Sequence, residues 1–511
     1  MQPIDLVIIF GYLIGITAFG ILYAGKQETT EDYFVGDRSV PWWAIAMSIV
    51  ATETSTITFV SVPGIAFAKG GNFQFLQLVF GYMLGRVVIS VIFIPLYFKG
   101  ELQTVYQLLG DRFGNKVKML ASALFVVMRN IADGIRLLLT AIVLAAVYTS
   151  FNPTADQTTI IIGSIILLGL VMIIFTFYGG MEAVIWVEVV QLVIYIGGAL
   201  AAAVVLIQNI DGGLSTVLNV GSQFDKFDVF DFNLDFAKTY TFWGGLIGGC
   251  FLTMSTHGTD QYLVQRYLCT NKPSSAATAL LSSGAVVLAQ FIGFLFIGVL
   301  LFAFYAPYSS AEYAQAGVAG SGVPGTFPFA KPDQVFPNFI TEHMPAGLSG
   351  LVVAAIFAAA LSSSLNSIAA TFINDLYKPF AKSVTDKQLL KLSGVLTVVI
   401  GIVQILVAMA FMATGESALN LALSVASLFN GPVLGVFLVG TFLKRAKEIH
   451  ALTGMVASTA LMIYILLAFN GFVPGPRIAW PWYALIGSVT TFAVTFIVTL
   501  LIRNNNDEVI S

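Results

Sequence analysis

Charged side chains are scarce in this chain of 511 residues: Asp, Glu, Lys and Arg together make up 10%, whereas hydrophobic residues make up 57%. Soluble domains carry about 25% charged residues, so this balance excludes an ordinary soluble protein. The net charge of -3, with no basic cluster, gives no indication of a nucleic-acid partner. The composition therefore predicts a protein that lies in a lipid bilayer.

Cysteine is almost absent as well. The two cysteines, Cys250 and Cys269, form neither a disulfide framework nor a metal-binding spacing. The sequence also lacks the HExxH, CxxC and GxSxG patterns that carry metal, redox and acyl-transfer chemistry, and it has no soluble signalling domain. A membrane-embedded enzyme or a sensor is therefore the less favoured alternative to a transporter.

Apolar residues come in blocks that are long enough to cross a bilayer, which takes about 20 residues. The loops on one side of the predicted spans carry sixteen Lys and Arg residues, and the loops on the other side carry five. Because basic loops stay in the cytoplasm, we expect an external N-terminus, a cytoplasmic C-terminus and a location in the plasma (inner) membrane. The thirteen predicted spans are 4–24, 42–68, 72–98, 117–149, 157–178, 182–207, 241–266, 275–305, 346–376, 390–413, 417–443, 449–470 and 481–503.

The second predicted span is polar in its middle, where residues 51–59 read ATETSTITF. β-Branched residues weaken a helix, and a carboxylate such as Glu53 costs about 2.5 to 3.5 kcal/mol inside a bilayer on insertion scales. An opened helix at membrane depth is tolerated where its carbonyls line a cavity or a protein-buried site. We therefore interpret this stretch as a broken helix that binds a solute and a coupling cation. A continuous helix whose Ser and Thr bond to their own carbonyls is the alternative.

A second interruption lies in the seventh span, which is rich in glycine over 243–250 and in hydroxyls over 253–259. It follows the first interruption by five spans, and five is odd, so the two halves have inverted topology. Interrupted helices at matching positions of inverted halves indicate the midplane site of a secondary transporter. We predict an all-α membrane protein of about thirteen helices in one transporter domain over 1–511. Its parts are an extra N-terminal helix (4–24), two inverted repeats (42–207 and 241–443) and two extra C-terminal helices (449–503).

Three small residues of the ninth span, Ala359, Ser362 and Ser363, are spaced i, i+3 and i+4 and share one helix face. One carbonyl and two hydroxyls there, together with the carbonyls of Ala51 and Thr54 in the broken span, are hard oxygen ligands that suit Na⁺. By spacing alone, a face of small residues that packs against another helix is the favoured alternative.

Several motifs together resemble the sodium:solute symporter family, which includes sodium–glucose and sodium–sialic acid cotransporters. The resemblance implies a five-plus-five inverted-repeat core of the LeuT type that works by alternating access. It also implies that the sodium site of the family falls on Ala51, Thr54, Ala359, Ser362 and Ser363. The motifs are Asp32–Arg38 with Pro41–Trp43, Tyr178–Gly180 with Trp186, Gly258–Gln261 with Gln265–Tyr267, and Ala354–Ala360 with Ser364–Ser367.

Two features depart from the family pattern. About three residues that usually follow Ser363, and that help to form a second sodium site in some members, are missing here. Placing the gap earlier would put Ala359 and Ala360 where the two hydroxyls are expected. The sixth span carries Glu188 in place of the usual Asp, one methylene longer, and Glu188 is the predicted ligand of a possible second cation site.

The resemblance places the substrate site where the two broken helices meet. Hydroxyls, amides and a carboxylate over aromatic surface suit a polyhydroxylated or zwitterionic solute. Each of these side chains could instead form an interhelical hydrogen bond. The matching residues are Glu53, Ser55, Thr58, Phe75, Gln77, Thr253, Thr256, His257, Ser424, Ser427 and Asn430.

The fourth span carries three charged residues, Arg129, Asp133 and Arg136. Asp133 and Arg136 are spaced i, i+3 and could form an internal ion pair. Alternatively, one arginine faces the cavity and holds an anionic substrate.

Taken together, these patterns predict a sodium-coupled symporter that imports a small polar organic solute, with a sugar or polyol favoured. A small organic anion or an amino-acid-like solute is the alternative, as is proton coupling through Glu53 or Glu188. The expected partners are the solute, Na⁺ as coupling ion and the bilayer. The protein is expected to function as a monomer and not as an enzyme.

Overall fold

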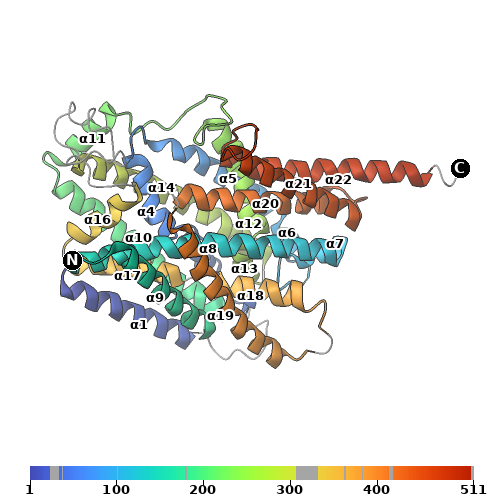
Figure 1. Cartoon of the computed structure of the whole chain (residues 1–511), viewed down its shortest axis with the longest axis horizontal. Helices are drawn as coiled ribbons and strands as arrows, with labels where there is room; N and C mark the ends of the chain where they lie inside the picture. The colour runs from blue at the N-terminus through green and yellow to red at the C-terminus, as the bar shows by residue number, and fades with distance from the viewer. Residues whose placement is uncertain are drawn as a thin grey trace.

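The computed structural model describes residues 1–23, 34–36, 38–100, 102–152, 154–178, 181–305, 332–361, 364–381, 384–413 and 418–507. Over these residues the chain is helical, and its one β-type pairing is an isolated bridge between Ser39 and Thr270. Most helices run along the long axis of one bundle, with the N-terminus at one end and the last helix reaching the other (Figure 1). Termini at opposite ends are what an odd number of crossings would give.

The described helices fall into two runs of similar length. The first run comprises α1 (Pro3–Tyr23), α3 (Trp42–Glu53), α4 (Thr56–Phe67), η1 (Phe73–Phe75), α5 (Leu76–Ile92), α6 (Ile94–Tyr97), α7 (Gln107–Phe113), α8 (Asn115–Phe151), α9 (Gln157–Tyr178), α10 (Met181–Gln208) and α11 (Gly213–Gln223). The second run comprises η2 (Gly244–Gly248), α12 (Gly249–Thr259), α13 (Gln261–Leu268), α14 (Pro273–Tyr305), η3 (Pro332–Gln334), α16 (Val335–Glu342), α17 (Leu348–Leu361), α18 (Leu365–Thr371), η4 (Phe372–Tyr377), α19 (Asp386–Ala410), η5 (Phe411–Ala413), α20 (Ala418–Phe442), α21 (Glu448–Phe469), η6 (Trp480–Trp482) and α22 (Tyr483–Asp507).

Ten helices in the described part of the chain are long and apolar enough to cross a membrane, or eleven if the bent pair α3 and α4 is counted as one span. They cover eleven of the predicted spans. The seventh and ninth predicted spans are instead divided into short helices, η2 with α12 and α13, and α17 with α18 and η4. The prediction of an all-helical membrane protein is therefore confirmed, whereas the count of thirteen and the repeat layout stay predictions.

The second predicted span is broken, as its polar middle indicated. Its two halves, α3 and α4, are bent by 57°. The Thr54 amide donates to the Val50 carbonyl at 2.7 Å, and the next turn of helix is closed by the Phe59 amide on the Ser55 carbonyl at 3.0 Å. Helical hydrogen bonding is thus interrupted between Thr54 and Phe59. The residues in between are Ser55 and three β-branched residues, Thr56, Ile57 and Thr58. The carbonyls at the end of α3 face this break.

Glycines bring α5 into backbone contact with η2 and α12. A Cβ built on Gly81 would lie 2.3 Å from the Gly245 carbonyl oxygen, and one on Gly249 would lie 2.6 Å from the Leu78 carbonyl oxygen. Residues without a side chain are therefore required on both helices, as is usual where membrane helices approach closely. This contact fixes α12 beside the break of the second span.

Short helices gather at the end of the bundle that holds the N-terminus, where α11 and α16 lie (Figure 1). They lie in the two long connections between predicted spans, 208–240 and 306–345, of which residues 306–331 lie outside the described residues.

Candidate functional site

A cavity of about 160 Å³ lies against the break between α3 and α4. Polar side chains from six helices line it, together with an apolar face of α20. The lining residues are Thr52, Glu53, Ser55, Ile57 and Thr58 from the broken span; Phe75 and Tyr82; Arg129, Ala132 and Arg136 from α8; Leu252, Thr253, Thr256, His257, Tyr262 and Leu263; Phe291 from α14; and Leu419, Ala422, Leu423 and Ala426 from α20.

Seven of the eleven predicted substrate residues line this cavity. They are Glu53, Ser55, Thr58, Phe75, Thr253, Thr256 and His257. Phe75 is stacked on Phe291 with ring centroids 5.0 Å apart, which gives one wall a flat aromatic surface. The two broken segments therefore do meet at a shared cavity, as the sequence interpretation required.

The other four predicted substrate residues lie elsewhere. The Gln77 side chain is buried and joins two backbones: its amide donates to the Gln74 carbonyl at 3.0 Å, and it accepts from the Asp231 amide at 2.8 Å. Ser427 bonds back to the Leu423 carbonyl at 2.7 Å, as membrane serines often do. On α20 the cavity face consists of Leu419, Ala422, Leu423 and Ala426, so Ser424, Ser427 and Asn430 are not part of the lining.

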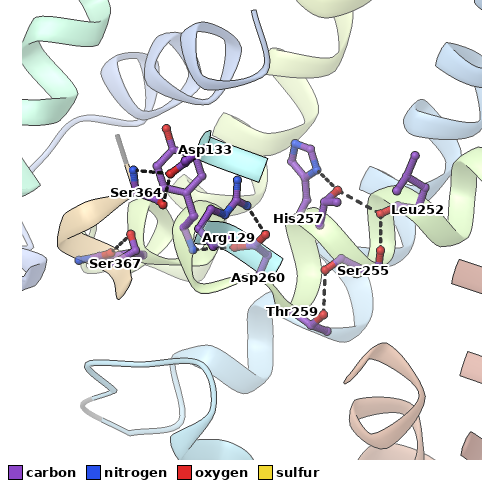
Figure 2. Close-up of polar contacts among 12 residues, drawn as sticks. Arg129, Asp133, Leu252, Ser255, His257, Thr259, Asp260, Ser364 and Ser367 are labelled. Atoms are coloured by element: carbon purple, nitrogen blue, oxygen red, sulfur yellow. Dashed lines mark hydrogen bonds and ion pairs between the residues drawn. The ribbon is translucent and has the colours of Figure 1, made fainter. Parts of the chain in front are cut away.

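Glu53 does not stand alone in the cavity wall. Its carboxylate forms an ion pair with Arg86 of α5 and lies 3.2 Å from Nε2 of His257. The other ring nitrogen of His257 lies 3.1 Å from the Thr256 hydroxyl, which donates to the Leu252 carbonyl at 3.0 Å (Figure 2). Arg86 is 1% exposed, so this pairing neutralises a charge that the apolar surroundings could not hold alone.

Two arginines of α8 reach the same cavity from the opposite side. Arg129 forms an ion pair with Asp260, which begins α13, and the two side chains point toward each other in Figure 2. Asp133 accepts hydrogen bonds from the hydroxyl of Ser364 and from its backbone amide, the latter at 3.2 Å (Figure 2). These contacts tie α8 to the short helices α13 and α18 beside the cavity.

Arg136 is less firmly held than Arg129. Its Nη1 lies 3.4 Å from an oxygen of Asp133 and 3.4 Å from the Tyr262 hydroxyl, both longer than the contact of Arg129 with Asp260; the buried Nε of each arginine has no hydrogen-bond partner among the described residues. Arg136 therefore pairs with Asp133 and also lines the cavity, whereas the predicted binding of an anionic substrate stays a prediction. A guanidinium with spare donors in a cavity wall is suited to a carboxylate.

Glu188 is paired with a cation of the protein itself. Its carboxylate accepts from Arg266 of α13, with one contact at 3.2 Å, from the Thr52 hydroxyl at 3.2 Å, and from the Ser48 hydroxyl. Glu188 and Arg266 are both fully buried. The predicted role of Glu188 in a second cation site stays a prediction, and a cation there would compete with the Arg266 guanidinium.

The predicted sodium site can be followed in part. Ala51 and Thr54 lie at the end of α3, beside the break, and Ala359 lies in α17. The hydroxyl of Thr56, at the start of α4, donates to the Ile356 carbonyl at 3.2 Å, so α17 does pack against the break. Ser362 and Ser363 lie outside the described residues. Within the described part of the chain, no group of three or more His, Cys, Asp or Glu residues could hold a metal ion.

Sequence reasoning missed several cavity residues. Tyr262 lies beneath three guanidinium groups, with its ring centroid 4.6 Å from Cζ of Arg129, 5.8 Å from that of Arg136 and 4.5 Å from that of Arg266. Its place two residues after Asp260, just beyond the second interruption, was the available signal. The apolar residues of α20 gave no signal, because their spacing is that of any packed helix.

The broken helix, the polar cavity and the ion pairs around it are features of a transporter. The chain belongs to the sodium:solute symporter family, whose family model matches residues 33–458. It is a sodium-coupled symporter and an integral membrane protein, it is not an enzyme, and Na⁺ is its coupling ion.

Among characterised proteins, the chain is 31% identical to the sodium/sialic acid symporter NanT of Aliivibrio fischeri, over 99% of this chain and 95% of that protein. It is 29% identical to human sodium-coupled monocarboxylate transporter 1, over 97% of this chain and 78% of that protein. A solved structure of a substrate-bound, outward-open Na⁺-coupled sialic acid symporter matches with a TM-score of 0.81 and 29% identity, over 98% of each chain.

Proposed function

We propose that the solute is a small organic acid, and that an acidic sugar is its most favoured form. The observation that supports this is Arg136, a cavity-lining guanidinium whose two polar contacts are both 3.4 Å long. Hydroxyls of Ser55, Thr58 and Thr253 offer partners for the hydroxyls of a sugar. This narrows the predicted sugar or polyol to a carboxylated one, and it retains the predicted organic anion as the wider class.

The relatives support the same class without identifying the solute. They include sodium/sialic acid symporters, which move a sugar acid, and sodium-coupled monocarboxylate transporters. Both solutes carry one carboxylate. An uncharged sugar and an amino-acid-like zwitterion are the competing classes. The zwitterion is disfavoured because Glu53 is already paired with Arg86 and His257.

A thermal-shift screen with the purified protein tests this proposal, because a ligand that binds the folded state stabilises it by mass action. The panel contains a sugar acid, a short monocarboxylate, an uncharged sugar and a zwitterionic amino acid, each with and without NaCl at one pH. We expect stabilisation by a carboxylated solute that depends on Na⁺. Stabilisation by the uncharged sugar alone would refute an acid as the solute, and stabilisation independent of Na⁺ would refute coupling at this site.

We further propose that the end of the bundle with α11 and α16 faces outward. The basic residues are concentrated in the loops at the opposite end, and such loops stay in the cytoplasm. A fluorescent reporter that matures only in the cytoplasm, fused to the C-terminus, should therefore be active. A reporter that is active only outside the cell would contradict both this orientation and the thirteen predicted spans.

The coupling ion is proposed to bind between Ala51, Thr54, Ala359, Ser362 and Ser363. Replacing Ser362 or Ser363 with alanine removes one oxygen ligand without adding bulk, so we expect the Na⁺ concentration for half-maximal uptake to rise about tenfold, with protein amount unchanged. The measurement is a Na⁺ titration of uptake. Ser393→Ala is the matched control, because Ser393 is a buried serine whose hydroxyl has no partner in the described part of the chain. The same Na⁺ dependence in both variants as in the control would mean that these serines only pack.

A further inference from the structure

Lys226 is a cation buried between the loop end of the bundle and the second half of the broken helix. It is 1% exposed although it lies in the connection between α11 and η2. Its ammonium donates to three successive carbonyls, those of Ala66 at 2.8 Å, Phe67 at 3.2 Å and Ala68 at 2.7 Å. All three N–H donors of the ammonium are thereby used. Its nitrogen also lies 3.9 Å from the centroid of the Phe302 ring of α14.

Two of these carbonyls are the last of α4, which ends at Phe67, and the third belongs to its C-cap residue Ala68, whose carbonyl also accepts from the Gly71 amide at 2.9 Å. The last carbonyls of a helix have no partner within it, and they carry the negative end of the helix dipole. A cation held there satisfies the carbonyls and is attracted by the dipole. Lys226 therefore caps α4 from a distant part of the sequence.

The backbone conformation before Lys226 directs its side chain toward the end of α4. Helix α11 ends with Asp225 in the left-handed region at φ 53°, an uncommon conformation for a residue other than glycine. The Lys226 amide then bonds to the Gly221 carbonyl at 2.9 Å, which is the bond pattern of a Schellman motif. The next residue, Phe227, packs its ring on Phe73 with centroids 5.6 Å apart. The turn is thus fixed on both sides of Lys226.

Two opposing effects act on the pKa of the Lys226 amine. Burial lowers the pKa of its amine from the usual value near 10.5 to about 7. The three carbonyl contacts oppose that shift because they favour the charged form. Among the described residues Lys226 forms no ion pair with a carboxylate. The cost of burying its charge is therefore offset by the carbonyls at the end of α4.

We propose that Lys226 is a positioning residue for the sodium and solute site, acting through α4. The opposite end of α4 begins directly after the break, and its first residues Ile57 and Thr58 line the cavity. The helix has 12 residues, is about 18 Å long and contains Pro63, so a cap at one end influences the direction of the turns that carry cavity residues at the other. Thr54 and Ala51 lie just across the break. This inference rests on the proposed sodium site.

The test uses the purified full chain, with NaCl as the probe and the melting temperature as the readout. Lys226→Met retains an unbranched stem and removes the charge and the donors. We expect the NaCl concentration that half-saturates this variant to rise about fivefold or more. The variant loses at least one net hydrogen bond that holds α4 in the direction needed for Na⁺ binding. Lys226→Arg restores donors to the same carbonyls and should recover part of the affinity. Lys69→Met, which removes an exposed lysine near the same end of α4, should leave the titration unchanged.

The outcomes separate the possibilities. If Lys226→Met melts earlier but titrates with NaCl like the unmodified chain, Lys226 is a structural cap only and the inference is overturned. If the unmodified chain shows no stabilisation by NaCl, the proposed sodium site fails instead. Should Lys226→Met fail to accumulate, Phe302→Leu removes the ring beside the ammonium with a milder change. It should raise the half-saturating NaCl concentration in the same direction, and an unchanged value there would also overturn the inference.

Discussion

Replacement of Arg136 by glutamine is expected to reduce uptake of a carboxylated solute by about 100-fold at solute concentrations below KM. A buried guanidinium that binds a carboxylate through two parallel N–H groups is geometrically specific, and loss of one partner of such a pair costs about 2 to 5 kcal/mol. If Arg136 binds the carboxylate equally strongly in every state of the transport cycle, its replacement should change KM more than the maximal rate. Lysine retains the charge but not the planar pair of donors, so Arg136→Lys should recover only part of the uptake.

Initial uptake rates over a range of solute concentrations, normalised to protein amount, provide the measurement. Arg477→Gln is a suitable control because it removes the same charge from an exposed position. The result that would sink the assignment is a loss of uptake in Arg136→Gln that accompanies a loss of folded protein. Arg136 would then act chiefly as the partner of Asp133, which lies 3.4 Å from it.

Removing the Glu188 carboxylate should have the largest effect on stability. Arg266 is fully buried and pairs with Glu188, so Glu188→Ala leaves a cation without its partner in an apolar interior. Breaking a buried pair in this way costs about 3 to 5 kcal/mol, which is a large fraction of the stability of a protein. We expect little folded Glu188→Ala in the membrane and a lower melting temperature for any that is purified.

The double variant Glu188→Leu with Arg266→Met distinguishes pairing from a cation site. If the two residues serve each other, the double variant should regain most of the lost stability, because replacing both members of a buried pair by apolar residues is often neutral. A stable single variant Glu188→Gln with a shifted Na⁺ dependence would contradict this account. It would support the predicted second cation site instead.

The helical class and the position of the break could be predicted from the sequence because both depend on local chemistry. Long apolar blocks must be helices in a bilayer, since only intrahelical hydrogen bonds satisfy the backbone there. A cluster of β-branched residues around Glu53 interrupts such a block without reference to any other part of the chain. The predicted break follows from that local pattern, whereas Ser55 and Thr58 were assigned to the substrate site by the resemblance to the family.

The partners of the buried charges could not be predicted, because they depend on which helices pack together. Glu188 meets Arg266 across 78 positions of sequence, and Glu53 meets Arg86 across 33. Nothing in the local pattern of either residue identifies its partner. Gln77, Ser424, Ser427 and Asn430 lie outside the lining of this cavity for a related reason: the rotation of α5 and α20 about their axes is set by packing. On α20 that rotation presents an apolar face.

The glycine contact between α5 and α12 limits how this transporter can move. Where two backbones touch, no side chains lie between them that could slide or change rotamer. The two helices therefore have little freedom to move relative to each other. The two helices should therefore keep their mutual geometry through the transport cycle and carry Arg86 and His257 together. Changes in access to the cavity must then arise where two helices can change their mutual angle, and the 57° bend between α3 and α4 is one such place. In this sense, glycines that do not line the cavity determine which part of the molecule moves.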